Sequence, residues 1–275
     1  AFKSAFALGG LGAYLTLITP LGATQLSLVG VGLAVLIVTL NILGTELTGK
    51  AQAVVVTAVV LGLVAYVGNT VWLAGTGSTA ADPSRLSGLT DSNPGTVVTA
   101  AALVFVSYAG VTKIASVAEE VQNPDKNLPR GILGSLGIMS VVYVGVIGCI
   151  VMLNDPAVLT GSAGGHGASL TPMADGASAL FGGYGTVVVS VLATVALLSM
   201  ANAGVLSSSR FPLAMSRDEL LPEALQTVDP RFSTPRNSIL RTGGVLGVLV
   251  AFVPVVTLAE MASAFIILVL SIINV

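Results

Sequence analysis

The sequence predicts an all-α bundle of membrane-spanning helices. The mean hydropathy is +0.94, and only 9% of the 275 residues are charged, against about 25% in an average soluble domain. Six apolar runs are long enough to cross a hydrocarbon core of about 30 Å, which takes about 20 helical residues. These runs do not alternate polar and apolar residues with the period of two that barrel strands show, so helices are favoured.

The runs and their connections follow in order along the chain. The long runs occupy 24–45, 51–74, 96–118, 131–153, 178–209 and 239–258, and two partial runs occupy 4–19 and 260–275. Segments rich in Pro, Gly, Asn and Asp separate them, at 19–22, 75–95, 123–129, 154–156 and 229–235. The chain opens at Ala1 without a Met and is still apolar at Val275, so we expect an internal fragment of a longer protein.

The positive charges indicate how the helices are oriented, because Lys and Arg accumulate in cytoplasmic loops. In the connections 73–95 and 154–177, Arg85 is the only cation. The alternate connections contain eight cations: Lys50, Lys126, Arg130, Arg210, Arg217, Arg231, Arg236 and Arg241. The sequence therefore predicts a multi-pass protein of the cell membrane, embedded in the lipid bilayer, with the second set of connections in the cytoplasm.

Composition also excludes several kinds of partner. The net charge is −2 and no long basic run is present, so we expect no nucleic-acid partner. The single Cys149 and the single His166 provide neither a disulfide framework nor a Cys/His metal cage. We expect no cofactor and no metal.

One cation lies inside an apolar run. Lys113 precedes the end of the run 96–118, and an ammonium at that depth costs a few kcal/mol. Small or hydroxylated residues stand just before it and can break a helix, leaving backbone groups free: Ser107, Tyr108, Ala109, Gly110 and Thr112. Two interpretations remain open: a functional break with a buried Lys113, or a continuous helix in which Lys113 extends to the headgroups and Gly110 serves helix packing.

The residues around Lys113 form a long motif with specific spacing. Its members are Ser107-Tyr108-Ala109-Gly110, Ala118-Glu119-Glu120, Asn123-Pro124, Asn127 and Pro129-Arg130. The motif resembles the sixth helix and following loop of the amino acid–polyamine–organocation (APC) transporters. The stretch 209–222, with 230–235 behind it, is similar to the end of their eighth helix and the next loop. A weaker match involves Asn41, Gly44 and Gln52.

The resemblance implies a LeuT-like fold of two inverted five-helix repeats, in which the first helix of each repeat is unwound at the membrane midplane. Residues 1–275 would form a single transporter-domain fragment, about helices three to ten of twelve. Residues 1–74 would end the first repeat, and 96–275 would make most of the second. The family's first helix, with its Gly-rich substrate motif, would be missing, so we expect that this chain does not transport by itself.

The resemblance also implies a substrate site at a break over 107–111, where free carbonyls and a helix end would meet a zwitterion. The sixth-helix candidates are Val106, Ser107, Ala109, Gly110 and Thr112. The eighth-helix candidates are Ser199, Asn202 and Ala203, at helical spacing. A Ser or Asn in the eighth helix could instead only bond a neighbouring helix, and both interpretations stay open.

Energy coupling departs from the pattern of several relatives. The position two after Gly110, often acidic in the family, is Thr112, and the run 54–67 has no charge where some relatives have a Lys in place of a sodium ion. Lys113 is the remaining candidate, because a buried Lys can exchange a proton near neutral pH. We expect a proton or a sodium ion as the coupling ion. Gates or solvated anchors at the cytoplasmic rim would be Glu119, Glu120, Arg210 and Arg217.

We expect a secondary transporter that moves amino acids or related amines by alternating access, through proton-coupled symport or exchange. The alternatives are a membrane-embedded enzyme and an ion channel. An enzyme would need a nucleophile with a base, or metal ligands, inside the bundle, and the apolar runs contain no His and no acidic pair. A channel would need a carbonyl filter or rings of like charge, and we find neither.

Overall fold

The computed structural model describes residues 2–43, 46–89, 93–108, 110, 121–162, 169–230, 232 and 234–273. It confirms the predicted fold class, because these residues form an all-α bundle and none of them lies in a strand. The α-helices are α1 (Phe2–Ile18), α2 (Ala23–Leu43), α3 (Glu46–Gly75), α4 (Pro94–Tyr108), α5 (Pro124–Leu153), α6 (Pro156–Thr160), α7 (Pro172–Arg217), α8 (Arg236–Phe252) and α9 (Val255–Ile273). Two short 3₁₀ helices, η1 (Pro83–Leu89) and η3 (Glu223–Leu225), lie in the connections.

The start of α5 differs from the prediction. Helix α5 begins at Pro124, so residues 124–130, predicted as a connection, form its first turns. Pro124 occupies the beginning of the helix, where its missing N–H removes no helical bond. Asn123, before it, has a φ of 49°, in the left-handed region that Asn tolerates. Pro129 is therefore part of the helix and not of a turn.

The predicted run 239–258 is wrong as a single helix, because the chain breaks at Pro254. The Val253 amide donates to the Leu249 carbonyl (3.0 Å) and closes α8. Pro254 has no N–H to continue the helix, and its carbonyl accepts from the Leu258 amide (3.0 Å) to start α9. A hydropathy pattern does not detect this break, because the residues on both sides of Pro254 are apolar.

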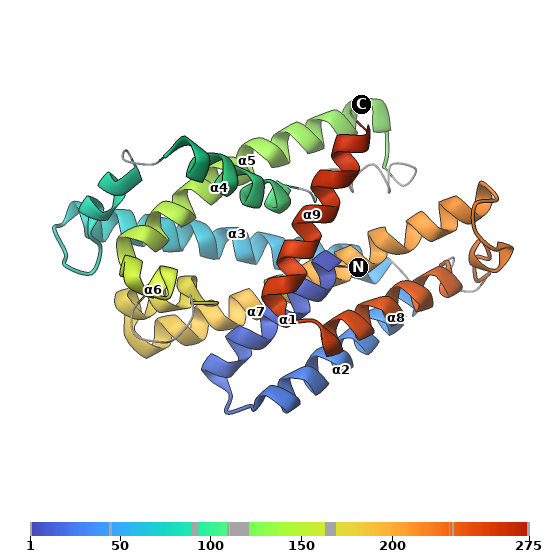
Figure 1. The fold of residues 1–275 in the computed structure, drawn as a ribbon, viewed down its shortest axis with the longest axis horizontal. Helices are drawn as coiled ribbons and strands as arrows, with labels where there is room; N and C mark the ends of the chain where they lie inside the picture. Colours follow the sequence, from blue (N-terminus) through green and yellow to red (C-terminus); the bar gives the residue numbers. More distant parts are fainter. Residues whose placement is uncertain are drawn as a thin grey trace.

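Helix α7 is longer than the predicted run 178–209 at both ends, and it is bent. It has 46 residues, and Gly182 within it has φ 61° and ψ −149°, a conformation almost confined to glycine. Ala174, Ala177 and Val189 pack in one apolar cluster with α3 and α5, whereas Ala201 and Val205, farther along the helix, pack in another cluster with α1. One long helix thus takes part in both halves of the bundle (Figure 1).

Two apolar clusters form the core. The first surrounds α1, which packs most extensively against α7 and also contacts α9, α8 and α2. Its fully buried members include Leu8, Ile37, Val205, Ile239, Leu246 and Leu258. The second cluster joins α3, α5 and the first part of α7 through Tyr66, Cys149, Met152, Leu153, Ala174, Ala177 and Val189.

Glycines allow the closest helix contacts. A Cβ on Gly204 of α7 would overlap the Ser4 hydroxyl of α1, and a Cβ on Gly243 of α8 would overlap Val38 of α2. Both glycines are buried. Small residues at such positions let helix backbones approach one another, which is the usual packing mode inside membranes.

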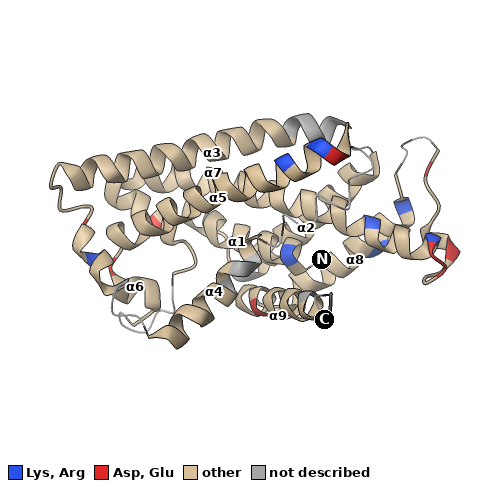
Figure 2. Ribbon diagram, turned by 90° about the horizontal axis from the view of Figure 1, so that it is seen from above, with Lys and Arg blue, Asp and Glu red and all other residues tan. Residues whose placement is uncertain are grey.

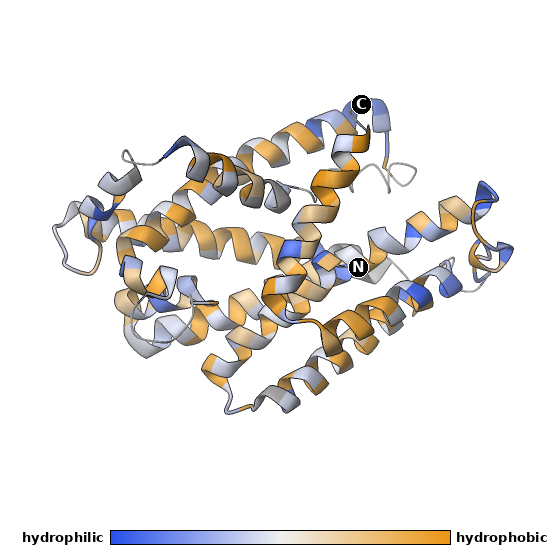
Figure 3. Cartoon of the chain, in the orientation of Figure 1, coloured by the Kyte–Doolittle hydropathy of each residue, from blue (hydrophilic) through white to orange (hydrophobic). Residues whose placement is uncertain are grey.

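The outer faces of the helices are apolar. Trp72 is 71% exposed and Val141 and Val144 are each 75% exposed, and Figure 3 shows hydrophobic residues along the helices and hydrophilic ones mainly in the connections. Within the described parts of the chain, four helical segments are long and apolar enough to cross a membrane: Thr24–Leu43, Gln52–Gly75, Pro124–Leu153 and Pro172–Arg217. Shorter apolar helices are Phe2–Ile18 and Val255–Val269.

The charged residues gather toward the ends of the molecule (Figure 2). Basic residues lie where α5 and α8 begin and where α7 ends, and these are the connections that the sequence assigns to the cytoplasm. The opposite end contains η1 and α6. The start of α1 is an exception, since the N-terminus lies near the middle of the molecule in both views (Figures 1 and 2).

Candidate functional site

Helix α4 ends inside the segment where the sequence predicts a break. Its last residue is Tyr108, and Gly110 lies in a turn. The Tyr108 hydroxyl donates to the Ser140 hydroxyl (3.2 Å), and the Tyr108 ring meets the Tyr143 ring edge-on with centroids 5.3 Å apart. Both contacts are to α5. The end of α4 is therefore anchored by an aromatic side chain to the neighbouring helix.

The carbonyl groups at this helix end have a cationic neighbour. The Lys3 ammonium of α1 donates to the Ser107 carbonyl at 3.5 Å. It also lies 3.7 Å from the position that a Cβ on Gly110 would occupy. The carbonyl end of a helix bears a partial negative charge, so a cation is favoured at this place.

Sequence reasoning missed Lys3. The first predicted run starts one residue later, at 4, and Lys3 is separated from Ser107 by 104 positions. The only available signal was that Lys3 precedes an apolar run without belonging to any of the basic connections. That signal shows an unusual lysine but does not identify its neighbour.

Two contacts fix the start of α1 around Lys3. The Phe2 ring stacks on the Phe265 ring of α9, with centroids 5.1 Å apart and planes inclined by 17°. Ser4 is 1% exposed and lies directly against Gly204 of α7. Because the residues on both sides of Lys3 are anchored to different helices, the backbone at Lys3 is held in place.

The eighth-helix candidates lie on α7, and Asn202 makes a contact between helices. The Asn41 amide of α2 donates to the Asn202 side-chain oxygen (2.7 Å) and to the Ile37 carbonyl (2.8 Å). Asn41 is buried, Ser199 and Asn202 are half-buried, and Ala203 is exposed. Among the described residues α4 packs against α9 and makes no extended contact with α7. This geometry favours the helix-bonding interpretation of Asn202.

Several predicted residues lie outside the described residues: Ala109, Thr112, Lys113, Glu119 and Glu120. Val106 belongs to α4, and its neighbour Ser107 is exposed. Their assignment to the substrate site or to coupling stays a prediction.

The basic end of the molecule is held by hydrogen bonds from buried hydroxyls. The Thr234 hydroxyl donates to the Ile42 carbonyl of α2 (2.9 Å), and the Ser238 hydroxyl donates to the Leu225 carbonyl of η3 (2.9 Å). Arg210 is half-buried and Arg217 is exposed, both near the end of α7. These contacts join the connection before α8 to α2, and α8 itself to η3, at the predicted rim.

At the opposite end, η1 is tied to the end of α5. The Asp82 amide (3.0 Å) and the Arg85 guanidinium (3.2 Å) both donate to the Met152 carbonyl. Hydrogen bonds from the Ser84 hydroxyl and the Ser84 amide keep the pKa of the Asp82 carboxyl below its ordinary value, and the Arg85 charge acts in the same direction. This arrangement caps α5 and contains none of the predicted site residues.

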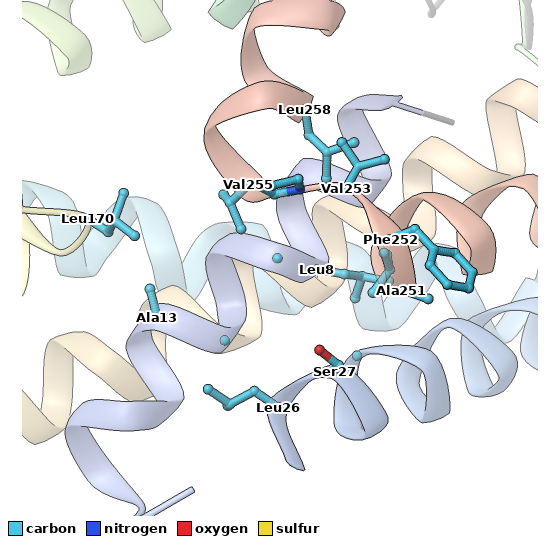
Figure 4. Close-up of a pocket in the computed structure, with 15 residues that line it drawn as sticks. Leu8, Ala13, Leu26, Ser27, Leu170, Ala251, Phe252, Val253, Val255 and Leu258 are labelled. Carbon is cyan, nitrogen blue, oxygen red and sulfur yellow. The ribbon is translucent and has the colours of Figure 1, made fainter. Parts of the chain in front are cut away.

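An apolar cavity of about 430 Å³ lies between α1, α2 and the junction of α8 with α9 (Figure 4). Leu8, Leu26, Val253 and Leu258 lie around it, and Ser27 contributes a hydroxyl. No charged side chain is among the described residues that line it. Ser27 is the one polar side chain among the described residues that line it, so the end of α4 is the better candidate for a polar substrate.

Comparisons with known proteins agree with the motif. A family model described as amino acid permease matches residues 4–275. An uncharacterized transporter of Mycobacterium tuberculosis is 33% identical over 227 residues, which are 82% of this chain and 49% of the relative. A methylthioribose transporter of Bacillus subtilis is 32% identical over 167 residues, 61% of this chain and 34% of the relative. A branched-chain amino acid permease of Lactococcus lactis is 33% identical over 165 residues, 59% of this chain and 33% of the relative.

The chain thus spans about half the length of the mycobacterial relative and about a third of the other two. The family match and the apolar helices together identify a multi-pass protein embedded in a membrane. The resemblance seen in the sequence motif is confirmed. The chain belongs to the amino acid permease family.

Proposed function

We propose that the protein is a secondary transporter of amino acids or related amines in the cell membrane, working by alternating access with proton-coupled symport or exchange. The observation that supports this most directly is the end of α4 at Tyr108, with the Ser107 carbonyl beside an ammonium. Carbonyl groups freed at a helix end inside a membrane bundle bind cations, and the amino group of a substrate is one.

The names of the relatives agree with this substrate class without narrowing it. They include branched-chain amino acid permeases, a cationic amino acid transporter of Arabidopsis thaliana and a methylthioribose transporter. We propose amino acids as the first class of substrate to test, because three of these relatives are named as amino acid permeases or transporters. The coupling role of Lys113 belongs to the same proposal, as do the cytoplasmic orientation of the basic connections and the roles of Glu119, Glu120, Arg210 and Arg217 at the rim.

Counterflow in proteoliposomes tests the proposal. The whole protein, loaded with an unlabelled amino acid, is expected to accumulate the labelled form of the same amino acid transiently, because a carrier exchanges one molecule for another. A pH gradient of either sign is expected to change net uptake. Labelled uptake that no internal amino acid stimulates, or that proceeds at the same rate through empty liposomes, would contradict a carrier of amino acids.

A second prediction concerns the pair Asn41 and Asn202. Asn41→Ala and Asn202→Ala are each expected to lower the unfolding free energy by about 1 kcal/mol, and the double variant is expected to lose little more than either single one. The reason is that each substitution removes the same hydrogen bond between α2 and α7. Melting temperatures in detergent measure the effect.

The control is Thr39→Ala, because the exposed Thr39 hydroxyl bonds only within its own helix, to the Val35 carbonyl. Substrate affinity separates the two interpretations of Asn202. A rise in KM for Asn202→Ala that Asn41→Ala does not share would show that Asn202 contacts the substrate, against our expectation that the two variants behave alike.

A further inference from the structure

We propose that the outward face of α8 binds one anionic phospholipid of the cytoplasmic leaflet, with the lipid phosphate at Arg236 and Arg241 and one acyl chain along the apolar residues that follow. The inference uses the membrane embedding of the bundle and the proposed cytoplasmic orientation of the basic connections, and it goes beyond the transport proposal. The starting observation is that the exposed face of this one helix changes from basic to apolar along its length (Figures 2 and 3).

The basic part of this face is formed by Arg236 and Arg241. Both side chains are exposed, in the first two turns of α8. Neither makes an ion pair or a side-chain hydrogen bond with the described part of the chain, in contrast to Arg85, which lies 3.8 Å from the Asp82 carboxylate. Exposed guanidinium groups without a carboxylate partner attract an anion, and the planar fork of a guanidinium matches two oxygens of a phosphate.

The apolar part of the face is a stripe of exposed side chains: Leu240, Val245, Val248 and Phe252, of which Phe252 is 81% exposed. Gly244 lies between Leu240 and Val248 at the helical spacing of four, and no atom lies within 4 Å of the position that its Cβ would take. The stripe therefore has a notch at Gly244, where a chain of CH2 groups can lie against the helix backbone.

The opposite face of α8 is already occupied within the bundle. Ile239 and Leu246 are buried in the first apolar cluster, and Gly243 lies directly against Val38 of α2. The two arginines and the stripe thus point away from the described helices. In a membrane, this outward face meets lipid headgroups at its basic end and acyl chains along the rest.

The face has the length of one lipid leaflet. Arg241 and Phe252 are eleven residues apart, which at 1.5 Å per residue is about 16 Å, and half of a hydrocarbon core of about 30 Å is about 15 Å. With Arg241 at the headgroups, Phe252 reaches the middle of the bilayer, and there the helix ends. A phospholipid has a phosphate and an acyl chain at this separation, whereas free phosphate would use only the arginines.

A second copy of the chain fits this face less well than a lipid. Copies of one protein share one orientation in the membrane, so two copies that met along α8 would place the arginines of one beside the same arginines of the other. Like charges at such an interface oppose association, whereas a phosphate group neutralises them. Charge complementarity therefore favours an anionic lipid.

The test titrates the whole protein, purified in a non-ionic detergent, with dioleoylphosphatidylglycerol, dioleoylphosphatidylcholine or inorganic phosphate. Native mass spectrometry counts the bound lipid, and the melting temperature reports stabilisation. We expect phosphatidylglycerol to bind about tenfold more tightly than phosphatidylcholine and to raise the melting temperature, because each arginine near an anionic lipid contributes about a fivefold change in affinity. Inorganic phosphate is expected to leave the melting temperature unchanged.

Three variants separate the two parts of the face. Arg236→Gln and Arg241→Gln are each expected to weaken the binding of phosphatidylglycerol about fivefold without changing that of phosphatidylcholine. Gly244→Leu is expected to weaken the binding of both lipids about fourfold, the effect of one displaced CH2 group. Arg241→Lys keeps the charge and is expected to keep most of the preference, which covers the case in which Arg241→Gln does not fold.

Two matched controls are expected to leave both affinities unchanged. Arg217→Gln removes an exposed arginine from the end of α7, beyond the apolar run 178–209. Gly32→Leu adds the same side chain as Gly244→Leu at an exposed glycine of α2 that has nothing within 4 Å of its would-be Cβ.

Equal affinities for the two lipids, or an unaltered preference in folded Arg236→Gln and Arg241→Gln variants, would overturn the proposal. Stabilisation by inorganic phosphate as large as that by phosphatidylglycerol would also overturn it, by showing a site for a free anion. A dimer that Gly244→Leu dissociates would overturn it by showing a second copy on this face. Counterflow of amino acids is measured separately, and its failure would contradict the proposed function while leaving the lipid site in place.

Discussion

Gly185→Ala is expected to destabilise the protein by about 3 kcal/mol or more, the largest effect of a single added methyl group in this fold. A Cβ on Gly185 would overlap the Ala177 carbonyl on the other side of the bend in α7. That atom belongs to the backbone and cannot rotate away, so the bend itself must open. Opening it would pull Ala174 and Ala177 out of the second apolar cluster.

Gly183→Ala is the matched control. Gly183 lies between the two glycines of the bend, is exposed and has no atom within 4 Å of its would-be Cβ. Alanine there is expected to be neutral or slightly stabilising, because it raises helix propensity. The melting temperature in detergent, with the monodispersity of the purified protein, measures both variants. Equal melting temperatures for the two would show that the bend is not fixed by the close approach of Gly185 to Ala177.

Gly243→Leu is expected to separate α8 from α2 and to lower stability by about 1–3 kcal/mol, as overpacked substitutions in tight cores do. The buried Gly243 faces Val38, and even a Cβ would overlap its side chain. The next residue offers the comparison: Gly244 is exposed with nothing within 4 Å, so Gly244→Leu is expected to leave the melting temperature nearly unchanged.

A smaller side chain at Val38 is expected to restore the stability that a substitution of Gly243 removes. The double variant Val38→Ala with Gly243→Ala is expected to recover most of the stability that Gly243→Ala loses, because the removed methyl groups make room for the new Cβ. No recovery would indicate that Gly243 acts through its backbone freedom and not through the contact with Val38.

The part of the fold that hydropathy describes was predictable. The runs 4–19 and 24–45 correspond closely to α1 and α2, because continuous apolar stretches between turn residues require helices that span a membrane. The errors arise where hydropathy and backbone geometry differ. Pro254 interrupts an apolar run without changing its hydropathy, and residues 210–217, which begin and end with an Arg, continue α7 beyond the predicted run.

The candidate site was predictable only in its local part. The small residues Ser107, Ala109 and Gly110 indicate the end of α4, because their effect on a helix is local. The contact of Lys3 with Ser107 joins residues 104 positions apart, and that of Asn41 with Asn202 joins residues 161 apart. Such pairs depend on how whole helices cross, and a single sequence contains no direct record of these crossings.

The length of α7 has a consequence outside the bilayer. With the end of the predicted run at residue 209 taken as the membrane boundary, the helix continues for eight further residues to Arg217, which at 1.5 Å each is about 12 Å. That reach exceeds the roughly 6 Å of one headgroup layer. Helix α7 would thus carry Arg217, and the turn with Glu219 that follows it, past the lipid headgroups on a stiff segment.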